Sequence, residues 1–133
     1  MSEQTPATVT VPFEITGWEA KTYEEPEEGP KLSSATVQKR FSGPLEGTSV
    51  AILLTAQGDE GNGYVASERV EGTLDGRSGT FVLQHGGIDD RGTPRAFGQI
   101  VPGSGTGELR GIRGEAAFAH DESGPRLTLT YTL

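Results

Sequence analysis

The sequence predicts an all-β protein of about eight antiparallel strands, arranged as a sandwich or a barrel. Apolar residues recur at every second position in several segments, which is typical of strands with one buried face. The chain contains 20 glycines among 133 residues without a three-residue period, which indicates frequent turns. Helical spacing of apolar residues is nearly absent, so long helices are not expected.

The alternation of apolar and polar residues, together with the turn residues, predicts where each strand begins and ends. Apolar residues alternate with polar ones from Val9 to Ile15, and the chain ends with the same pattern. The Glu-rich stretch 24–28 is broken by Pro26, so a solvated loop is expected there. Later boundaries follow turn pairs such as Asp75-Gly76. The predicted strands cover residues 8–16, 33–42, 47–56, 63–73, 77–86, 95–101, 114–120 and 126–133.

Length, charge and composition restrict the domain count and the partners. A chain of 133 residues is one domain, predicted over residues 8–133 after a loosely held segment 1–7. The absence of cysteine excludes disulfides, thiolate zinc sites and cysteine nucleophiles. A formal charge of −8 disfavours nucleic acid, whose phosphates require clustered Lys and Arg. Because no spanning run or export signal is visible, we expect a cytoplasmic protein without a membrane partner.

Motifs for phosphate, metal or serine chemistry are missing from the sequence. The stretch from Gly103 to Gly107 is rich in glycine, but no Gly-Lys-Ser follows it and no helix is expected there. His85 and His120 are the two histidines of the chain, and they are not at helical spacing. No calcium loop or Gly-x-Ser-x-Gly elbow occurs. We therefore expect no cofactor and no metal.

The predicted hairpin around Asp75-Gly76 carries the main functional indication. A two-residue turn at this dipeptide pairs Glu68 with Leu83, by counting outward along both strands. Glu68 and His85 then share the apolar face, as diagonal neighbours about 7–8 Å apart at the backbone. A carboxylate beside an imidazole in an apolar interior can perform general acid–base catalysis, so Glu68 and His85 are the candidate catalytic residues. The same pair is also compatible with a structural ion pair or with two groups satisfied by buried water.

Four further side chains are candidates for ligand contact. Tyr64, Phe81 and Leu83 belong to the same predicted inward face, and Trp18 is an aromatic residue with a polar edge. Tyr64 and Trp18 could line a pocket and donate a hydrogen bond to a ligand. Both are equally compatible with ordinary packing in the core or at its rim.

Short blocks of sequence, specific in combination, extend over nearly the whole chain from about Thr8 to Leu133. They include Phe13-Glu14 with Trp18-Glu19, Gly29-Pro30-Lys31-Leu32, Glu68-Arg69-x-Glu71-Gly72-Thr73-Leu74-x-Gly76-Arg77-Ser78-Gly79-x-Phe81, Gln84-His85-x-Gly87 and Pro102-Gly103-Ser104-Gly105-Thr106-Gly107-Glu108-Leu109. In these blocks the sequence resembles a bacterial family known as domain of unknown function 3224.

This resemblance implies a closed antiparallel barrel of about eight strands, like that of allene oxide cyclase. The stretch from Gly105 to Gly114 is similar to the glycine-rich connection of allene oxide cyclases and dirigent proteins. The family has no assigned activity, so the resemblance implies no catalytic residue. It places Glu68 and His85 within recurring motifs.

Three functions are compatible with these observations. In the first, the barrel interior binds a small apolar or aromatic molecule. In the second, the protein is a cofactor-independent cyclase or isomerase in which Glu68 shuttles a proton, His85 orients or charges Glu68, and Tyr64 adds a hydrogen bond. In the third, the barrel is a non-enzymatic homo-oligomeric scaffold or interaction module, whose outward apolar residues, such as Leu53 and Val65, form one patch.

Overall fold

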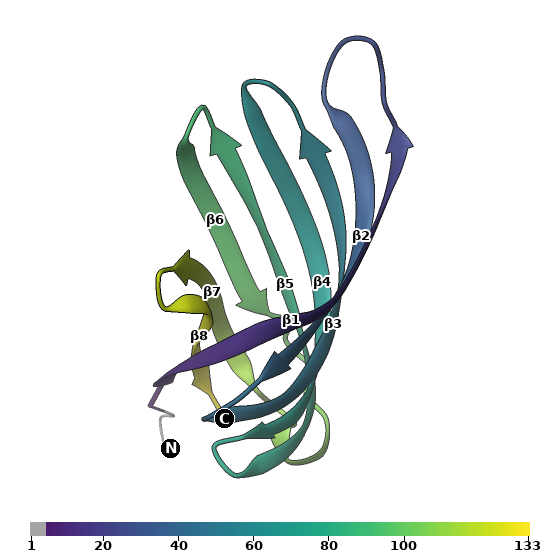
Figure 1. Cartoon of the computed structure of the whole chain (residues 1–133). Coiled ribbons are helices and arrows are strands. Elements are labelled where there is room, and N and C mark those ends of the chain that lie inside the picture. The colour runs from purple at the N-terminus through teal and green to yellow at the C-terminus, as the bar shows by residue number, and fades with distance from the viewer. Residues whose placement is uncertain (1–4) are drawn as a thin grey trace.

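The computed structural model describes residues 5–133 as eight antiparallel strands that form a ring (Figure 1). Each strand pairs with the next along the chain, and β1 pairs with β8 to close the barrel. The predicted all-β barrel is thereby confirmed. No helix among these residues is long and apolar enough to cross a membrane. The strands are β1 (Ala7–Glu24), β2 (Lys31–Phe41), β3 (Leu45–Gln57), β4 (Gly61–Leu74), β5 (Arg77–Asp90), β6 (Thr93–Ile100), β7 (Arg113–Asp121) and β8 (Gly124–Thr132).

The hairpin of β4 and β5 has the register that the turn dipeptide predicts. Leu74 pairs with Arg77, and counting outward brings Ala66 opposite His85. Asp75 and Gly76 both have positive φ, 48° and 85°, as a type I′ turn requires. The two turn residues therefore determine which side chains of this hairpin face the barrel interior.

Strand β1 is longer than predicted, ending at Glu24 instead of near residue 16. A bulge at Thr16, between the paired residues Ile15 and Gly17, shifts the alternation by one residue. A search for strict alternation stops at this point, which explains the short prediction. The exposed loop 25–30 follows, as expected for the Glu-rich stretch. Of the segment predicted to be loosely held, residues 1–4 lie outside the described part of the chain, and β1 already begins at Ala7.

One end of the barrel is filled by apolar side chains. The connection from β6 to β7 contains a short 3₁₀ helix, Gly107–Leu109, and it buries Leu109 and Ile112 fully in this core. The Thr106 amide donates to the Thr80 carbonyl at 2.8 Å, which ties the connection to β5. The glycine-rich stretch is thus part of the barrel wall. The fully buried apolar residues at this end are Val11, Leu45, Val70, Leu74, Phe81, Leu83, Ile100, Leu109, Ile112, Leu127 and Leu129.

The other end of the barrel is open. Strand β1 pairs with β8 only as far as Pro12, and from Phe13 onward it pairs with β2. Within the described chain, β6 and β7 pair at two positions, Gln99 with Glu115 and Ile100 with Gly114. Figure 1 shows that β2 to β6 and the second half of β1 continue beyond this level as a curved sheet. The polar residues of the interior lie between the filled core and this open end.

Candidate functional site

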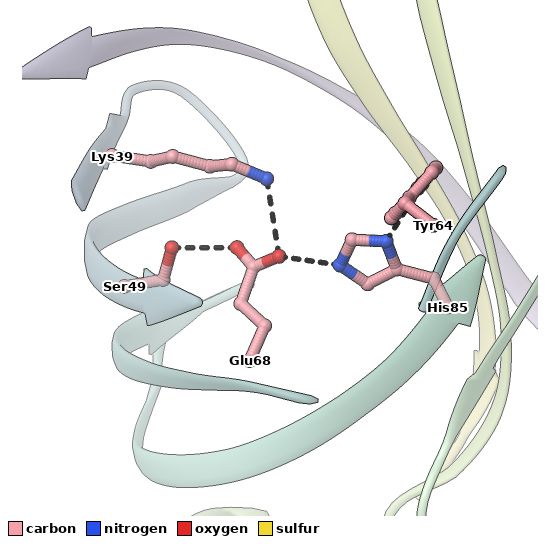
Figure 2. Close-up of polar contacts among 5 residues, drawn as sticks. All are labelled: Lys39, Ser49, Tyr64, Glu68 and His85. Atoms are coloured by element: carbon pink, nitrogen blue, oxygen red, sulfur yellow. Dashed lines mark hydrogen bonds and ion pairs between the residues drawn. The ribbon is translucent and has the colours of Figure 1, made fainter. Parts of the chain in front are cut away.

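Five polar side chains meet in the barrel interior and form a single hydrogen-bonded cluster (Figure 2). Lys39 comes from β2, Ser49 from β3, Tyr64 and Glu68 from β4, and His85 from β5. Glu68 is 0% exposed, His85 4% and Lys39 7%, whereas Tyr64 is half-buried. Groups this deeply buried are stable only when they are paired and hydrogen-bonded.

The Glu68 carboxylate is the centre of the cluster. Its Oε1 atom accepts from Lys39 Nζ at 3.1 Å and from His85 Nε2 at 2.8 Å. Its Oε2 atom accepts from the Ser49 hydroxyl at 2.6 Å. On the far side of the imidazole, the Tyr64 hydroxyl lies 3.0 Å from His85 Nδ1. The result is a chain of contacts from Tyr64 through His85 to Glu68.

Strand register explains why these residues meet. Ala66 pairs with His85, so Glu68, two residues further along β4, is the diagonal neighbour of His85 on the same face. Lys39 pairs with Ser49 across β2 and β3, which brings both polar side chains to the inward face beside Glu68. Every buried side-chain nitrogen and oxygen of residues 5–133 has a hydrogen-bond partner.

The surroundings of Glu68 keep it ionised. Burial by itself opposes the charge, but the hydrogen bond from His85, the positive charge of Lys39 and the hydrogen bond from Ser49 outweigh it. Together they hold the pKa of Glu68 below its usual value. An ionised carboxylate only accepts hydrogen bonds, so the proton of the 2.8 Å contact resides on His85 Nε2.

Aromatic rings surround the Lys39 ammonium group. Its Nζ atom lies 4.3 Å from the centre of the Phe118 ring and 4.9 Å from that of Phe13. Such cation–π contacts stabilise a desolvated cation. Lys39 and Glu68 therefore form a buried ion pair with no net charge.

A cavity of about 520 Å³ occupies the open end of the barrel above this cluster. Lys39, Tyr64 and His85 lie on its inner wall, and Trp18 and Ile88 lie on its sides. The wall is predominantly apolar, whereas Asp89, Arg95 and His120 are on the lining as well. The other lining residues are Phe13, Ile15, Val37, Leu53, Thr55, Ala56, Gln57, Asn62, Gly63, Gly87, Pro94, Ala96 and Phe118.

The structure separates the candidate residues that the sequence grouped together. Tyr64, Trp18 and His85 line the cavity. Glu68 lies behind His85 and is not part of the lining. Phe81 and Leu83 are fully buried in the core of the closed end, because they are nearer to the Asp75-Gly76 turn than His85 is. They are therefore core residues and not part of the cavity wall.

Lys39 and Ser49 were not identified as candidates from the sequence. In β2, the inward positions Ala35, Val37 and Phe41 are apolar and buried, and Lys39 is the buried charged residue of the same alternating series. A charged residue at an inward position of a strand is the sequence feature that could have identified Lys39. For Ser49, a small polar residue, the sequence carries no comparable indication.

A second opening lies in the barrel wall between β6 and β7, where the two strands diverge. It has a volume of about 500 Å³ and is lined by residues of β6, β7 and β8. Tyr64, Ala96 and Phe118 line both this opening and the cavity at the barrel end. The two spaces therefore adjoin at the Tyr64 side chain.

The outer face of the barrel carries several exposed apolar residues. Val65 is 52% exposed, and its neighbours across the sheet include Leu54 on β3. The expectation that Leu53 belongs to this outer patch is wrong, because Leu53 pairs with Ala66 and Ala35 on the inward face. Across residues 5–133, no group of three or more His, Asp or Glu side chains could hold a metal ion.

Comparisons with known proteins give a family but no activity. The family model described as "Protein of unknown function (DUF3224)" matches residues 9–133. A crystal structure of a DUF3224 protein of unknown function from Shewanella oneidensis MR-1 superimposes with a TM-score of 0.87 and 34% sequence identity, covering 96% of each chain. Among curated proteins, none matches the sequence significantly.

Proposed function

The chain belongs to the DUF3224 family, whose description assigns no activity, and we propose from its site that the protein binds a small apolar or aromatic molecule in the open end of the barrel. The observation that carries this proposal is a cavity of about 520 Å³ with a largely apolar wall and one polar cluster at its base. Sites for small molecules typically have volumes of about 300–1,000 Å³ and a few placed polar groups.

Small side chains leave the room for this molecule. Four positions on the cavity lining carry a methyl group or no side chain at all, namely Ala56, Gly63, Gly87 and Ala96. Larger side chains at the same positions would extend the core into the open end. The aromatic residues Trp18, Phe13 and Phe118 remain on the wall, where flat rings can pack against a ligand.

Fluorescence of the natural protein tests the proposal directly. Trp18 is the single tryptophan of the chain and lies on the cavity wall, so a bound probe should change its emission. Titration with the uncharged probe N-phenyl-1-naphthylamine should give saturable energy transfer from Trp18. The Ala96→Phe variant, which narrows the cavity, should weaken binding about tenfold.

The matched control adds the same ring outside the barrel. Ser67 is exposed on the outward face of β4, so the Ser67→Phe variant should bind the probe as the natural protein does. Equal binding by the Ala96→Phe and Ser67→Phe variants, or no saturable transfer at all, would contradict a ligand site in this cavity.

A second candidate function is proton transfer on a bound molecule, and the contacts from Tyr64 to Glu68 favour it. A substrate proton would pass to the Tyr64 oxygen while the Tyr64 proton moves to His85 Nδ1, and the Glu68 carboxylate would stabilise the imidazolium that forms. Return of the proton to another atom of the substrate would complete an isomerisation or cyclisation. Glu68 orients and charges His85 in this scheme, whereas the sequence suggested the reverse division of roles.

Hydrogen–deuterium exchange on an enolisable ketone tests this second candidate. In D₂O, the natural protein should accelerate exchange of the α-protons of 2-tetralone, observed by NMR, and the Tyr64→Phe and His85→Gln variants should not. General acid–base catalysis typically contributes about 10²–10⁴-fold. An exchange rate equal to that of buffer alone would remove the support for this activity.

The oligomeric scaffold expected as a third function stays a prediction. The exposed outward residues Ile52, Leu54, Val65 and Phe97 are the part of the surface on which it depends. Light scattering of the purified protein tests it, because a monomer at all concentrations would exclude a homo-oligomeric scaffold.

A further inference from the structure

We propose that the molecule bound in the cavity is uncharged and carries a hydrogen-bond donor, a hydroxyl or N–H group, which it directs to the Tyr64 oxygen. This inference rests on the proposed function and narrows the class of ligand. It follows from the charges on the inner wall, from the direction of the hydrogen bonds in the cluster and from the position of Tyr64.

The charges of the inner wall favour a neutral ligand. The Lys39 ammonium is neutralised by Glu68 at 3.1 Å and lies against Phe13 and Phe118. An anionic ligand would have to draw Lys39 away from a fully buried carboxylate, which would leave Glu68 without its main countercharge. A cationic ligand would approach Lys39 itself. Asp89, Arg95 and His120 also line the cavity, but they are not part of the polar cluster, and Arg95 and His120 are exposed to solvent.

The hydrogen bonds of the cluster are all donated toward Glu68. Glu68 is ionised, so His85 Nε2 carries a proton and donates it to Glu68. Lys39 and Glu68 already sum to zero charge, and a neutral His85 keeps the buried cluster neutral. In a neutral imidazole with a proton on Nε2, Nδ1 is an acceptor. The Tyr64 hydroxyl therefore donates its proton to His85 Nδ1.

Tyr64 lines the ligand space, and its hydroxyl oxygen can accept one more hydrogen bond. A phenolic hydroxyl has one proton, which His85 receives, and oxygen lone pairs that can accept another hydrogen bond. Burial and the nearby Glu68 charge raise the pKa of Tyr64, so the hydroxyl stays protonated. Both ring nitrogens of His85 are already engaged. Because Tyr64 lines both the cavity and the adjoining wall opening, its oxygen is the acceptor that the polar cluster offers to a ligand.

Three molecules of nearly equal shape test the inference on the intact protein. Indole carries an N–H donor, benzofuran an oxygen acceptor, and indene neither. Binding is measured by titration of amide chemical shifts in isotope-labelled protein, which detects weak binding and locates it. We expect indole to bind about 3- to 10-fold more tightly than benzofuran and indene, as for one net hydrogen bond.

The Tyr64→Phe variant removes the hydroxyl and keeps the ring. It should bind the three probes equally and at the level of indene. The matched control, Tyr23→Phe, changes an exposed tyrosine of β1 outside the cavity lining and should keep the preference for indole.

Each outcome separates this inference from the proposed function. Binding of all three probes in the cavity without a preference for indole overturns the donor inference and leaves the proposed function intact. A preference for benzofuran overturns it as well, because Lys39 would then be donating to the ligand. A preference for indole that survives in Tyr64→Phe also overturns it. If none of the probes perturbs cavity residues, the proposed function and this inference both fail.

Discussion

Glu68 has the chemistry of an orienting residue. Its two oxygens accept three hydrogen bonds, from Lys39, Ser49 and His85, and the side chain is fully buried. A carboxylate held in this way has a lowered pKa and is a weak base. Lys39, Tyr64 and His85 line the ligand space, and Lys39 is already paired with Glu68, which leaves Tyr64 and His85. A search for the reactive group should therefore begin at these two side chains.

Replacing Glu68 should destabilise the fold strongly at neutral pH. The Glu68→Gln variant would leave the Lys39 ammonium buried without a countercharge, and we expect a loss of about 3 kcal/mol in the free energy of unfolding. The Lys39→Met/Glu68→Gln double variant removes both charges and should recover part of this loss. Urea denaturation of Glu68→Gln, Lys39→Met and the double variant measures the coupling, and strictly additive effects would contradict a shared ion pair.

The contribution of Glu68 to the free energy of unfolding should also depend on pH. Its pKa is lower in the folded protein than the ordinary value of 4.5, so the unfolded chain binds the proton more readily. The stabilisation is then fully present above pH 4.5 and is lost as the pH falls through the lower pKa of the folded state. The difference in unfolding free energy between the natural protein and Glu68→Gln should therefore shrink below pH 4.5. A difference that stays constant from pH 7 to pH 3 would mean that folding does not lower the pKa of Glu68.

At the scale of elements, turns determine which contacts can be predicted from sequence. The Asp75-Gly76 turn fixes the register of β4 and β5, and with it the proximity of Glu68 and His85. The connection from β2 to β3 consists of residues 42–44 and does not reveal its register in the same way. Lys39 and Ser49 come from these two strands, which is why the contact of these two residues of the five with Glu68 could not be predicted by counting from a turn.

The bulge in β1 limited the prediction in a different way. Trp18 pairs with Val37 on the inward face only because the alternation shifts at Thr16. Strict counting from Phe13 would place Trp18 outward. The polar edge of its ring thus indicated Trp18 as a candidate, but its position in the cavity depends on an irregularity that a single sequence does not display.

Glycines on neighbouring strands allow the barrel to curl at its closed end. Gly47, Gly72 and Gly79 pair in one row across β3, β4 and β5. A Cβ atom on Gly72 would lie 2.2 Å from the Glu46 carbonyl oxygen, closer than any side chain can approach. The bent sheet therefore requires glycine at this position.

The Gly72→Ala variant should consequently lose at least about 2 kcal/mol of stability, because backbone atoms must move to admit the methyl group. Thermal and urea unfolding measure this loss. Gly58→Ala is the matched control, since its nearest neighbouring atom would be 3.4 Å away, and we expect a change below about 0.5 kcal/mol there. Similar stability of the two variants would show that the close approach at Gly72 is relaxed in solution.

At the scale of the whole molecule, the two ends of the barrel have different constructions. At the closed end, the Tyr131 hydroxyl of β8 donates to the Asp75 carboxylate in the turn between β4 and β5. Burial and this carboxylate raise the pKa of Tyr131 to about 12, so the bond is kept across the neutral range. At the open end, β6 and β7 separate after two paired positions, and the cavity and the wall opening occupy the space. The filled end of the barrel thus holds the polar cluster at the base of an open end that has room for the proposed ligand.

This asymmetry should appear in amide hydrogen exchange. Strand β4 is paired along its length on both sides, with β3 and β5, whereas residues 93–98 of β6 are paired on one side with β5. Backbone amides without a ladder partner exchange through small local openings, and fully paired strands exchange through larger ones. Peptides covering 93–98 should therefore take up deuterium well before peptides covering 64–74, as measured by mass spectrometry.

Binding in the cavity should reduce the difference in deuterium uptake between residues 93–98 and 64–74, because mainly the uptake of 93–98 should become slower. Ala96 lines both the cavity and the wall opening, so a bound molecule would pack against β6 and slow exchange of residues 93–98. Residues 64–74 are already protected by two neighbouring strands and should change much less. With N-phenyl-1-naphthylamine as the probe, equal exchange of 93–98 and 64–74 in the free protein would contradict the open seam. If the probe slows exchange in other segments and not in β6, the ligand binds outside the barrel end.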